Sequence, residues 1–258
     1  MNSGMKECDR SSVCMAAYNG ERFIRKQLES ILAQIGSNDE VIIIDDGSSD
    51  STPDIVRQMA ASDPRVKLII NEKNLGVNAT FEKAIRLASG KYIFLSDQDD
   101  IWTDGRYQLM LGELASRNVL CVSGNFDFID AEGKPLDLEI IKLDSKDSSA
   151  YTKNIIRIFT GKMCYFGCAM AFDCRLKDII LPFPEGLECH DLWIAMAANY
   201  MKSNVHLDDS VLLHRLHGKN VTDAHRALKA KLRSRKIMFS MLRTLKKRKL
   251  RLPDKELE

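Results

Sequence analysis

The sequence lacks any long apolar run. None of its 258 residues lies in a stretch approaching the roughly 18 to 20 consecutive apolar residues of a membrane-spanning helix. The first ten residues carry Lys6, Glu7, Asp9 and Arg10 where a signal peptide has an apolar centre. We therefore expect a cytoplasmic protein.

Paired cysteines, internal repeats and low-complexity linkers are also lacking. The seven cysteines are an odd number, and their spacing does not match that of a zinc finger, so we expect mostly buried thiols and no disulfide. A hydrophobic content of 45% and a charged content of 29% are ordinary for a soluble globular protein and exclude a disordered chain. The length fits one compact domain.

Negative charge is missing from one region, residues 226–251, which contain twelve Lys or Arg and no carboxylate. The net charge of the whole chain is only +2, so the rest of the chain is acidic. A basic helix with interspersed leucines is typical of a segment that rests on an anionic membrane surface. A solvated helix and a dimer contact are the alternatives. We do not expect nucleic acid as a partner, because aromatic interleaving and a known binding motif are absent.

Two apolar runs, 41–44 and 92–95, each lead into a cluster of acidic residues. Such runs are typical of buried strands, and the carboxyl ends of parallel strands meet at one edge of a sheet, where open α/β folds bind ligands. Crowded carboxylates repel one another unless a cation lies between them, which favours a hard metal that in turn holds phosphates. The acids are Asp45 and Asp46 after the first run, and Asp97, Asp99 and Asp100 after the second.

The first half of the chain alternates between expected strands and helices. This order predicts an α/β fold with a mostly parallel sheet and right-handed crossovers. The strands are expected at 13–15, 41–44, 66–70 and 92–95, with helices at 24–35, 53–59 and 81–88.

The second half is less regular. We expect two strands, 120–123 and 126–129, on either side of a turn at Asn125, and a central strand at 164–172. The polar segment 142–151 is long enough to suggest a mobile lid. A helix over 190–200 and short strands at 205–207 and 211–214 complete the pattern.

The order of these motifs resembles that of the inverting glycosyltransferases of family 2, which have the GT-A fold. The resemblance covers roughly residues 10–225. Within the family, the motif sequences are most similar to those of rhamnosyltransferases of surface-polysaccharide synthesis. The matching pieces are 17–21 (AYNGE), 45–52 (DDGSSDST), 74–76 (NLG), 90–102 (GKYIFLSDQDDIW), 190–193 (HDLW) and 215–222 (RLHGKNVT).

The resemblance implies a domain organisation. Residues 1–225 would form the GT-A domain, with a donor half at about 10–105 and an acceptor half at about 106–225 of mixed sheet. Residues 226–258 would form a basic C-terminal helical tail.

The resemblance also implies roles for individual residues. Asp46 would contact the nucleotide base with Tyr18 packing nearby, Asp97 would reach the ribose, and Arg215 or Lys219 would assist at the phosphates. Mg²⁺ or Mn²⁺ would bind Asp99, with His217 reaching back toward the metal or the diphosphate, and Asp191 would be the general base that deprotonates the acceptor.

Plainer interpretations exist for the same residues. Asp46 could open a turn, Asp191 could cap the helix that follows it, and His217 could be an ordinary loop histidine. Trp102 and Trp193 are expected in the core rather than in an acceptor site.

The function implied is transfer of a sugar from a nucleoside diphosphate, UDP or dTDP, with rhamnose as a candidate, to a hydroxyl of a glycan or lipid-linked oligosaccharide. The enzyme would work in the cytoplasm, at the inner face of the cell membrane. A non-catalytic nucleotide- or glycan-binding protein on the same fold is one alternative. A sugar nucleotidyltransferase is another, but it would require a glycine-rich phosphate loop, and residues 16–22 supply only Gly20.

Overall fold

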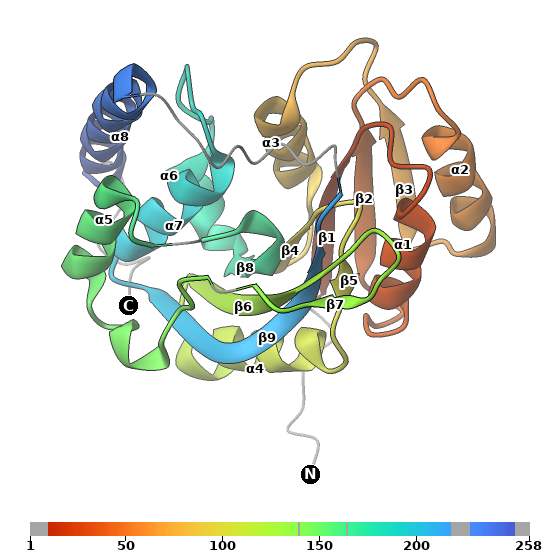
Figure 1. Ribbon diagram of the computed structural model, residues 1–258, viewed down its shortest axis with the longest axis horizontal. Helices are drawn as coiled ribbons and strands as arrows, with labels where there is room; N and C mark the ends of the chain where they lie inside the picture. The colour runs from red at the N-terminus through yellow and green to blue at the C-terminus, as the bar shows by residue number, and fades with distance from the viewer. Residues whose placement is uncertain (1–9, 139, 164, 218–227, 251–258) are drawn as a thin grey trace.

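The computed structural model describes residues 10–138, 140–163, 165–217 and 228–250, with side chains of the last helix from residue 234 onward. Figure 1 shows a curved sheet with helices on both faces. In the described part of the chain, no helix combines the length and the apolar character that crossing a membrane requires.

The described strands form one nine-stranded sheet in the order β3-β2-β1-β4-β8-β6-β9-β5, with β7 paired to β6. The first four strands are parallel, as predicted, while β8 runs antiparallel to both β4 and β6. The sheet is therefore parallel from β3 to β4 and mixed from β4 to β5. The strands are β1 (Ser11–Ala17), β2 (Glu40–Asp45), β3 (Val66–Ile70), β4 (Tyr92–Ser96), β5 (Ile101–Trp102), β6 (Cys121–Ile129), β7 (Pro135–Leu136), β8 (Met170–Asp173) and β9 (Asn204–Arg215).

Helices cover both faces because the inner strands are apolar on both sides. Along β1, Val13 and Met15 pack with residues of α1, α2 and α4, whereas Cys14 packs with α3 and α7 on the other face. The α-helices are α1 (Ile24–Leu32), α2 (Thr52–Ser62), α3 (Val77–Leu87), α4 (Arg106–Arg117), α5 (Tyr151–Thr160), α6 (Lys177–Ile180), α7 (His190–Tyr200) and α8 (Leu228–Lys249). Short 3-10 helices lie at η1 (Ser145–Asp147), η2 (Gly167–Ala169) and η3 (Cys174–Leu176).

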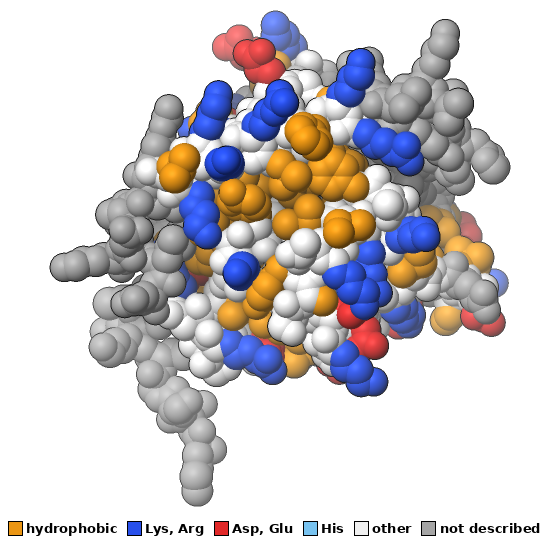
Figure 2. Space-filling view, turned by 90° about the vertical axis from the view of Figure 1, so that its left-hand side faces the viewer, with side chains coloured by type: hydrophobic (Ala, Val, Ile, Leu, Met, Phe, Trp, Pro, Cys, Tyr) orange, Lys and Arg blue, Asp and Glu red, His pale blue; other side chains and the backbone are white. Residues whose placement is uncertain are grey.

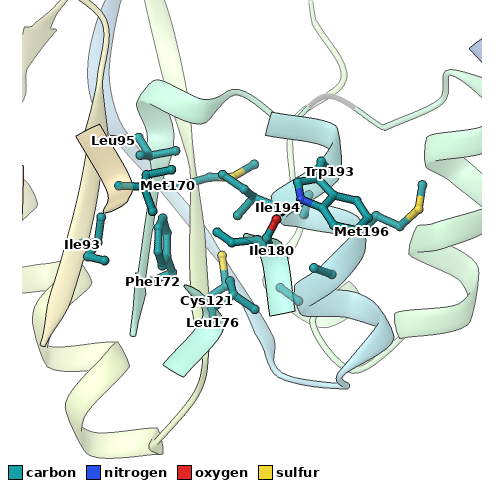
Figure 3. Packing of buried hydrophobic residues seen from close by; sticks show 14 of the residues in the cluster. Ile93, Leu95, Cys121, Met170, Phe172, Leu176, Ile180, Trp193, Ile194 and Met196 are labelled. Atoms are coloured by element: carbon teal, nitrogen blue, oxygen red, sulfur yellow. Dashed lines mark hydrogen bonds between the residues drawn. The ribbon is translucent and has the colours of Figure 1, made fainter. Parts of the chain in front are cut away.

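Helix α7 is buried on nearly all sides, and this burial fixes its first turn. Figure 3 shows Trp193 and Ile194 of α7 in one apolar cluster with Phe172 and other residues of β4 and β8. The Trp193 indole Nε1 donates to the carbonyl of Ile180 at 2.9 Å, which satisfies its only polar group. Burying each such large apolar side chain stabilises the fold by about 1.5–3 kcal/mol. The core placement predicted for Trp193 and Trp102 is confirmed.

The turn predicted at Asn125 is wrong, because β6 runs without a break from Cys121 to Ile129. Asn125 lies between two register shifts against β9, and its Nδ2 donates to the carbonyls of Leu143 and Leu207. Gly124 leaves room for Val211, whose side chain would lie 2.7 Å from an added Cβ. A Gly-Asn pair that is typical of turns here forms a bulge. The two short strands expected near 205–214 are likewise one strand, β9.

Two other predictions for the second half need correction. The strand expected at 164–172 is confined to Met170–Asp173, since a 3-10 helix occupies Gly167–Ala169. The segment expected as a loop at 142–151 contains η1 and is fastened to β9. The Ser145 backbone N–H donates to Asp208 at 2.8 Å, and the His206 backbone N–H donates to Ser148 Oγ at 2.9 Å.

Candidate active site

The loop after β4 carries three carboxylates and is joined to the end of β1. Gln98 accepts a hydrogen bond from the Tyr18 backbone N–H at 2.9 Å and donates to the Tyr18 carbonyl at 3.0 Å. Gly20 allows this approach, because an added Cβ would lie 2.1 Å from Gln98 Oε1. The carboxyl ends of β1 and β4 thus lie together. The Asp46 backbone N–H donates to the Ala17 carbonyl at 2.7 Å, so the end of β2 lies at the same edge, and the two acidic clusters meet there as the sequence predicts.

Asp99 and His217, far apart in the sequence, are brought together. His217 Nε2 lies 2.8 Å from Asp99 Oδ2, and both side chains are largely buried. The His217 ring stacks on Phe23 with centroids 5.0 Å apart, which fixes its direction. The pair is therefore a preformed cluster of one carboxylate oxygen and one imidazole nitrogen.

Asp100 has other partners than this pair and holds the end of β9. Its Oδ1 lies 2.9 Å from His214 Nδ1 and accepts the Arg215 backbone N–H at 3.0 Å. Burial alone lowers the pKa of His214, but the hydrogen bond to Asp100 and the surrounding negative charge raise that pKa to about 9. His214 is thus a counter-ion inside the acidic cluster.

Asp97 and Asp99 are carboxylates in an unfavourable environment. Surrounding protein atoms desolvate Asp97, and the charges of Asp100 and Asp99 add to this effect, so the pKa of Asp97 lies well above its usual range. The pKa of Asp99 is raised for the same two reasons, although His217 partly offsets the shift. A cation bound here would relieve a repulsion that the fold alone does not.

Asp191 occupies the first turn of α7, at the edge of the same cluster. Its negative charge contributes to the raised pKa of Asp97, so the two carboxylates are near neighbours. Its Oδ2 accepts the Gly167 backbone N–H at 3.3 Å, and its Oδ1 accepts the Cys189 thiol at 2.7 Å. The carboxylate is oriented by both donors, which suits a group that removes a proton from a substrate.

Asp46 lies at the end of β2 and joins it to the loop before α3. It accepts from Asn71 Nδ2 at 2.8 Å, from the Leu75 backbone N–H at 2.9 Å and from the Gly76 backbone N–H at 2.8 Å. Tyr18 lies beyond the end of β1 with 47% of its surface exposed. Tyr18 is therefore accessible to a ligand at the carboxyl end of β1. The Asp46 carboxylate is instead hydrogen-bonded to the segment that leads to α3.

Arg215 contacts backbone carbonyls around the acidic loop. Its Nε donates to the Asp99 carbonyl at 2.8 Å, and its Nη1 donates to the Asp130 carbonyl at 3.0 Å. Its guanidinium lies over the Phe23 ring, 4.9 Å from the centroid. These contacts fasten the acidic loop after β4 to the end of β9 and to the turn at Asp130. Lys219, the other cation considered for the phosphates, lies outside the described residues.

Asp99 and His217 are a suitable donor set for Mg²⁺ or Mn²⁺. Carboxylate oxygen suits both ions, and Mn²⁺ also accepts imidazole nitrogen. Two neighbouring ligands of an octahedral ion with bonds of about 2.1 Å lie about 3 Å apart, and the observed separation is 2.8 Å. The residues present therefore fit the metal that the sequence predicts.

The described residues contain a second, buried group of side chains that could bind a metal, and one of them directly follows Asp99 in the sequence. Asp100, Cys168 and His214 place one ligand atom each within 4.8 Å of one another. Burial raises the pKa of the Cys168 thiol well above its usual range, which disfavours the thiolate that a metal requires. Asp99 and His217 therefore fit Mg²⁺ or Mn²⁺ better than this group does.

Sequence reasoning missed the buried cation Arg106. Its Nη2 donates to the Cys168 carbonyl at 2.5 Å, and its guanidinium lies 4.3 Å from the centroid of the Trp102 ring. Burial lowers its pKa to about 10, and the charges of Asp97 and Asp100 partly counter that shift. An arginine at the start of an amphipathic helix carries no sequence signal that distinguishes it from a surface residue.

Comparison with known proteins identifies the family. The family model for glycosyl transferase family 2 matches residues 12–178, which include β1, β2, β4 and the acidic loop. The chain belongs to glycosyltransferase family 2. One relative, the Escherichia coli UDP-Glc:alpha-D-GlcNAc-diphosphoundecaprenol beta-1,3-glucosyltransferase WfgD, is 34% identical over 119 residues, which are 46% of each chain.

Solved structures show that the fold is GT-A. *S. aureus* TarS in complex with UDP-GlcNAc has a TM-score of 0.66 at 18% identity, over 96% of this chain and 69% of that one. The mannosyltransferase PcManGT from *Pyrobaculum calidifontis*, in complex with GDP-Man and Mn²⁺, has a TM-score of 0.63 at 20% identity, over 81% of this chain and 58% of that one. The chain spans about half the length of the curated relatives it matches.

Proposed function

We propose that this family 2 protein is a metal-dependent inverting glycosyltransferase of cell-surface polysaccharide synthesis. Its donor is a UDP- or dTDP-linked sugar, with rhamnose among the candidates, and its acceptor is a hydroxyl of a lipid-linked oligosaccharide at the inner face of the membrane. The observation that carries this proposal is the position of Asp191 in the first turn of α7, near enough to the acidic loop after β4 for its charge to act on Asp97.

The donor would bind across the ends of β1, β2 and β4. Tyr18 and Asp46 would receive the base and Asp97 the ribose, with Arg215 near the phosphates. Mg²⁺ or Mn²⁺, held by Asp99 and His217, would neutralise the diphosphate and stabilise the charge it acquires on leaving. The raised pKa values of Asp97 and Asp99 support this assignment, because a bound cation favours their charged forms.

Asp191 would act as general base in a single displacement. The acceptor hydroxyl loses its proton to the Asp191 carboxylate as its oxygen forms a bond to the anomeric carbon. The bond between that carbon and the diphosphate oxygen breaks, and the electron pair leaves with the diphosphate. Because attack and departure occur on opposite faces, the anomeric configuration inverts.

Two relatives support the choice of substrates. The name of WfgD describes a UDP-sugar donor and a sugar-diphosphoundecaprenol acceptor, and TarS was solved with UDP-GlcNAc. A nucleoside-diphosphate sugar suits an acidic loop that could bind a metal, and an acceptor hydroxyl suits the neighbouring Asp191 as base.

The proposal is tested by measuring nucleoside diphosphate release from UDP-, dTDP- and GDP-sugars with Mn²⁺ and sugar-diphosphoundecaprenol acceptors. We expect acceptor-dependent release with one base, reduced at least 100-fold in Asp191→Asn. Donor binding by Asp191→Asn should stay within a few-fold of the native protein. Donor binding without release, with every acceptor tried, would favour a non-catalytic binding protein instead.

A further inference from the structure

Helices α5 and α8 form one side of the molecule, and this side combines apolar and basic side chains. Figure 2 shows apolar side chains near the middle of this face with Lys and Arg around them. The large exposed apolar residues of the two helices are Ile156 and Phe239, each with 57% of its surface accessible. Both helices pack against α7, so they belong to the same layer of the fold.

One face of α8 is fastened to the protein, which fixes the direction of the other. Met241 and Leu245, one turn apart, are buried against the core. Arg248 donates to the carbonyls of Ile179 and Pro182, each at 2.6 Å. The helix is therefore docked, and its remaining face points outward.

The outward face of α8 has a repeating pattern. Arg235, Phe239, Arg243, Lys246 and Lys247 are all exposed. The first four follow one another at spacings of three or four residues, which places them along one side of the helix, and Lys247 is adjacent to Lys246. Residues 228–250 contain ten Lys or Arg and no Asp or Glu. A docked helix with cations along an exposed face and an aromatic residue among them has the charge and shape of an interfacial membrane contact.

We propose that the face formed by α5 and α8 docks on an anionic lipid bilayer. The cations of α8 contact lipid phosphates, while Phe239 and Ile156 enter the boundary between the headgroups and acyl chains. The proposal deepens the proposed function, because it rests on a lipid-linked acceptor and gives the surface on which the enzyme meets it.

The docking face is joined to the candidate base. Ser234 Oγ, near the start of the described part of α8, donates to Glu188 Oε2 at 2.5 Å. Glu188 lies three residues before Asp191, in the segment that enters α7. A bilayer bound at α8 would therefore lie beside the segment that carries the base, where an acceptor anchored in lipid would arrive.

Vesicle co-sedimentation of the full chain tests the proposal. We expect binding to phosphatidylcholine vesicles containing 30% phosphatidylglycerol, at least tenfold weaker binding to pure phosphatidylcholine, and release by 0.5 M salt. Lys246→Glu/Lys247→Glu should weaken binding at least tenfold, and Phe239→Ser/Ile156→Ser should weaken it several-fold. The matched control is Arg25→Glu/Lys26→Glu on α1, which changes net charge equally on an exposed site away from this face.

Three outcomes would overturn the proposal. These are no binding to the anionic vesicles, equal losses in the α8 variant and the α1 control, and a dimer in sedimentation velocity that Phe239→Ser/Ile156→Ser dissociates. The variants should keep the melting temperature of the native protein, which excludes misfolding. Asp191→Asn should bind vesicles normally, so failure of docking and failure of catalysis are distinguishable.

Discussion

Glu40 lies at the amino end of the parallel strands, whereas Asp97 and Asp99 lie at their carboxyl end. Glu40 begins β2, whereas Asp97 and Asp99 follow the end of β4. All three carboxylates are largely withdrawn from water. Hydrogen-bond donors surround Glu40, whereas other carboxylates surround Asp97 and Asp99. Glu40 therefore stabilises the protein, and we propose that Asp97 and Asp99 serve its chemistry.

Glu40 is surrounded by donors. It accepts from Lys67 Nζ, Ser12 Oγ and Ser89 Oγ, each at 2.6 Å. Burial alone raises its pKa, but these hydrogen bonds outweigh that effect and lower the pKa to about 2. Its charged form therefore stabilises the native state at neutral pH.

Asp97 and Asp99 are compensated only in part, by His214 and His217, and burial and the repulsion among neighbouring carboxylates raise their pKa values. Their charged forms destabilise the native protein as pH rises above about 4. The protein supplies the donors at the amino edge of the sheet. At the carboxyl end of the strands, the repulsion among the carboxylates remains, and a bound metal would relieve it. Such a cost is typical of functional sites.

The largest expected effect separates activity from stability at Asp97. Asp97→Asn removes a desolvated negative charge without changing the shape of the side chain. We expect transfer to fall at least 100-fold, while the melting temperature rises by about 2–4 °C. Differential scanning fluorimetry and the release assay check both. A fall in melting temperature would contradict the claim that this carboxylate costs stability.

His214 sets an expected pH dependence within the site. Its pKa is raised to about 9, so its contribution is complete below pH 6.5 and is lost as pH rises through 9. We expect that loss, about 2 kcal/mol, to disappear in His214→Gln.

Urea unfolding between pH 6 and 9.5 measures this loss. His206→Gln is the matched control, because burial lowers the pKa of His206, so its titration contributes no loss of stability as pH rises. An unchanged slope in His214→Gln would show that His214 is not the counter-ion.

Glu40→Gln should produce the opposite result from Asp97→Asn. We expect a loss of about 1 kcal/mol at pH 7, after allowing for solvent screening, with transfer essentially unchanged. Because the pKa of Glu40 is lowered to about 2, its contribution is present above pH 4.5 and vanishes as pH falls toward 2. Unfolding of the two proteins at pH 7 and pH 3 checks this. A difference that grew on acidification would have the wrong sign.

The smallest expected effect concerns the orientation of Asp191. Cys189→Ala removes the thiol that donates to Asp191 Oδ1, whereas Cys189→Ser keeps a donor. We expect a two- to fivefold fall in kcat for the alanine variant, with little change in donor KM, and recovery in the serine variant. A shift of the pH–rate profile in the alanine variant would support an effect on the base. Equal losses in both variants would indicate packing instead.

The parallel half of the fold could be predicted because its signals are local. Strands β1 to β4 are short apolar runs that end in polar turns, and parallel pairing brings their carboxyl ends together. The edge that collects the acids of β2 and β4 follows from that topology. The sequence therefore predicts which loops meet at this edge, namely those after β2 and β4.

The mixed half could not be predicted in the same way. Whether Gly124 and Asn125 form a turn or a bulge depends on contacts with Leu143 and Leu207, which are remote in the sequence. The burial of Arg106 beneath the acidic loop, and the separate partners of Asp99 and Asp100, likewise depend on how β9 closes against the sheet. Non-local pairing determines these features, and no local pattern records it.

The most direct test of the account is thermal stabilisation by UDP, dTDP, GDP and CDP, with and without Mn²⁺, in the native protein and in Asp99→Asn. Ligand that binds only the native state at 100 times its Kd stabilises that state by about 2.7 kcal/mol. We expect one nucleotide to raise the melting temperature only when Mn²⁺ is present, and Asp99→Asn to abolish that rise. Stabilisation that is independent of metal, or unchanged in Asp99→Asn, would contradict the assignment of this edge as a metal-dependent donor site.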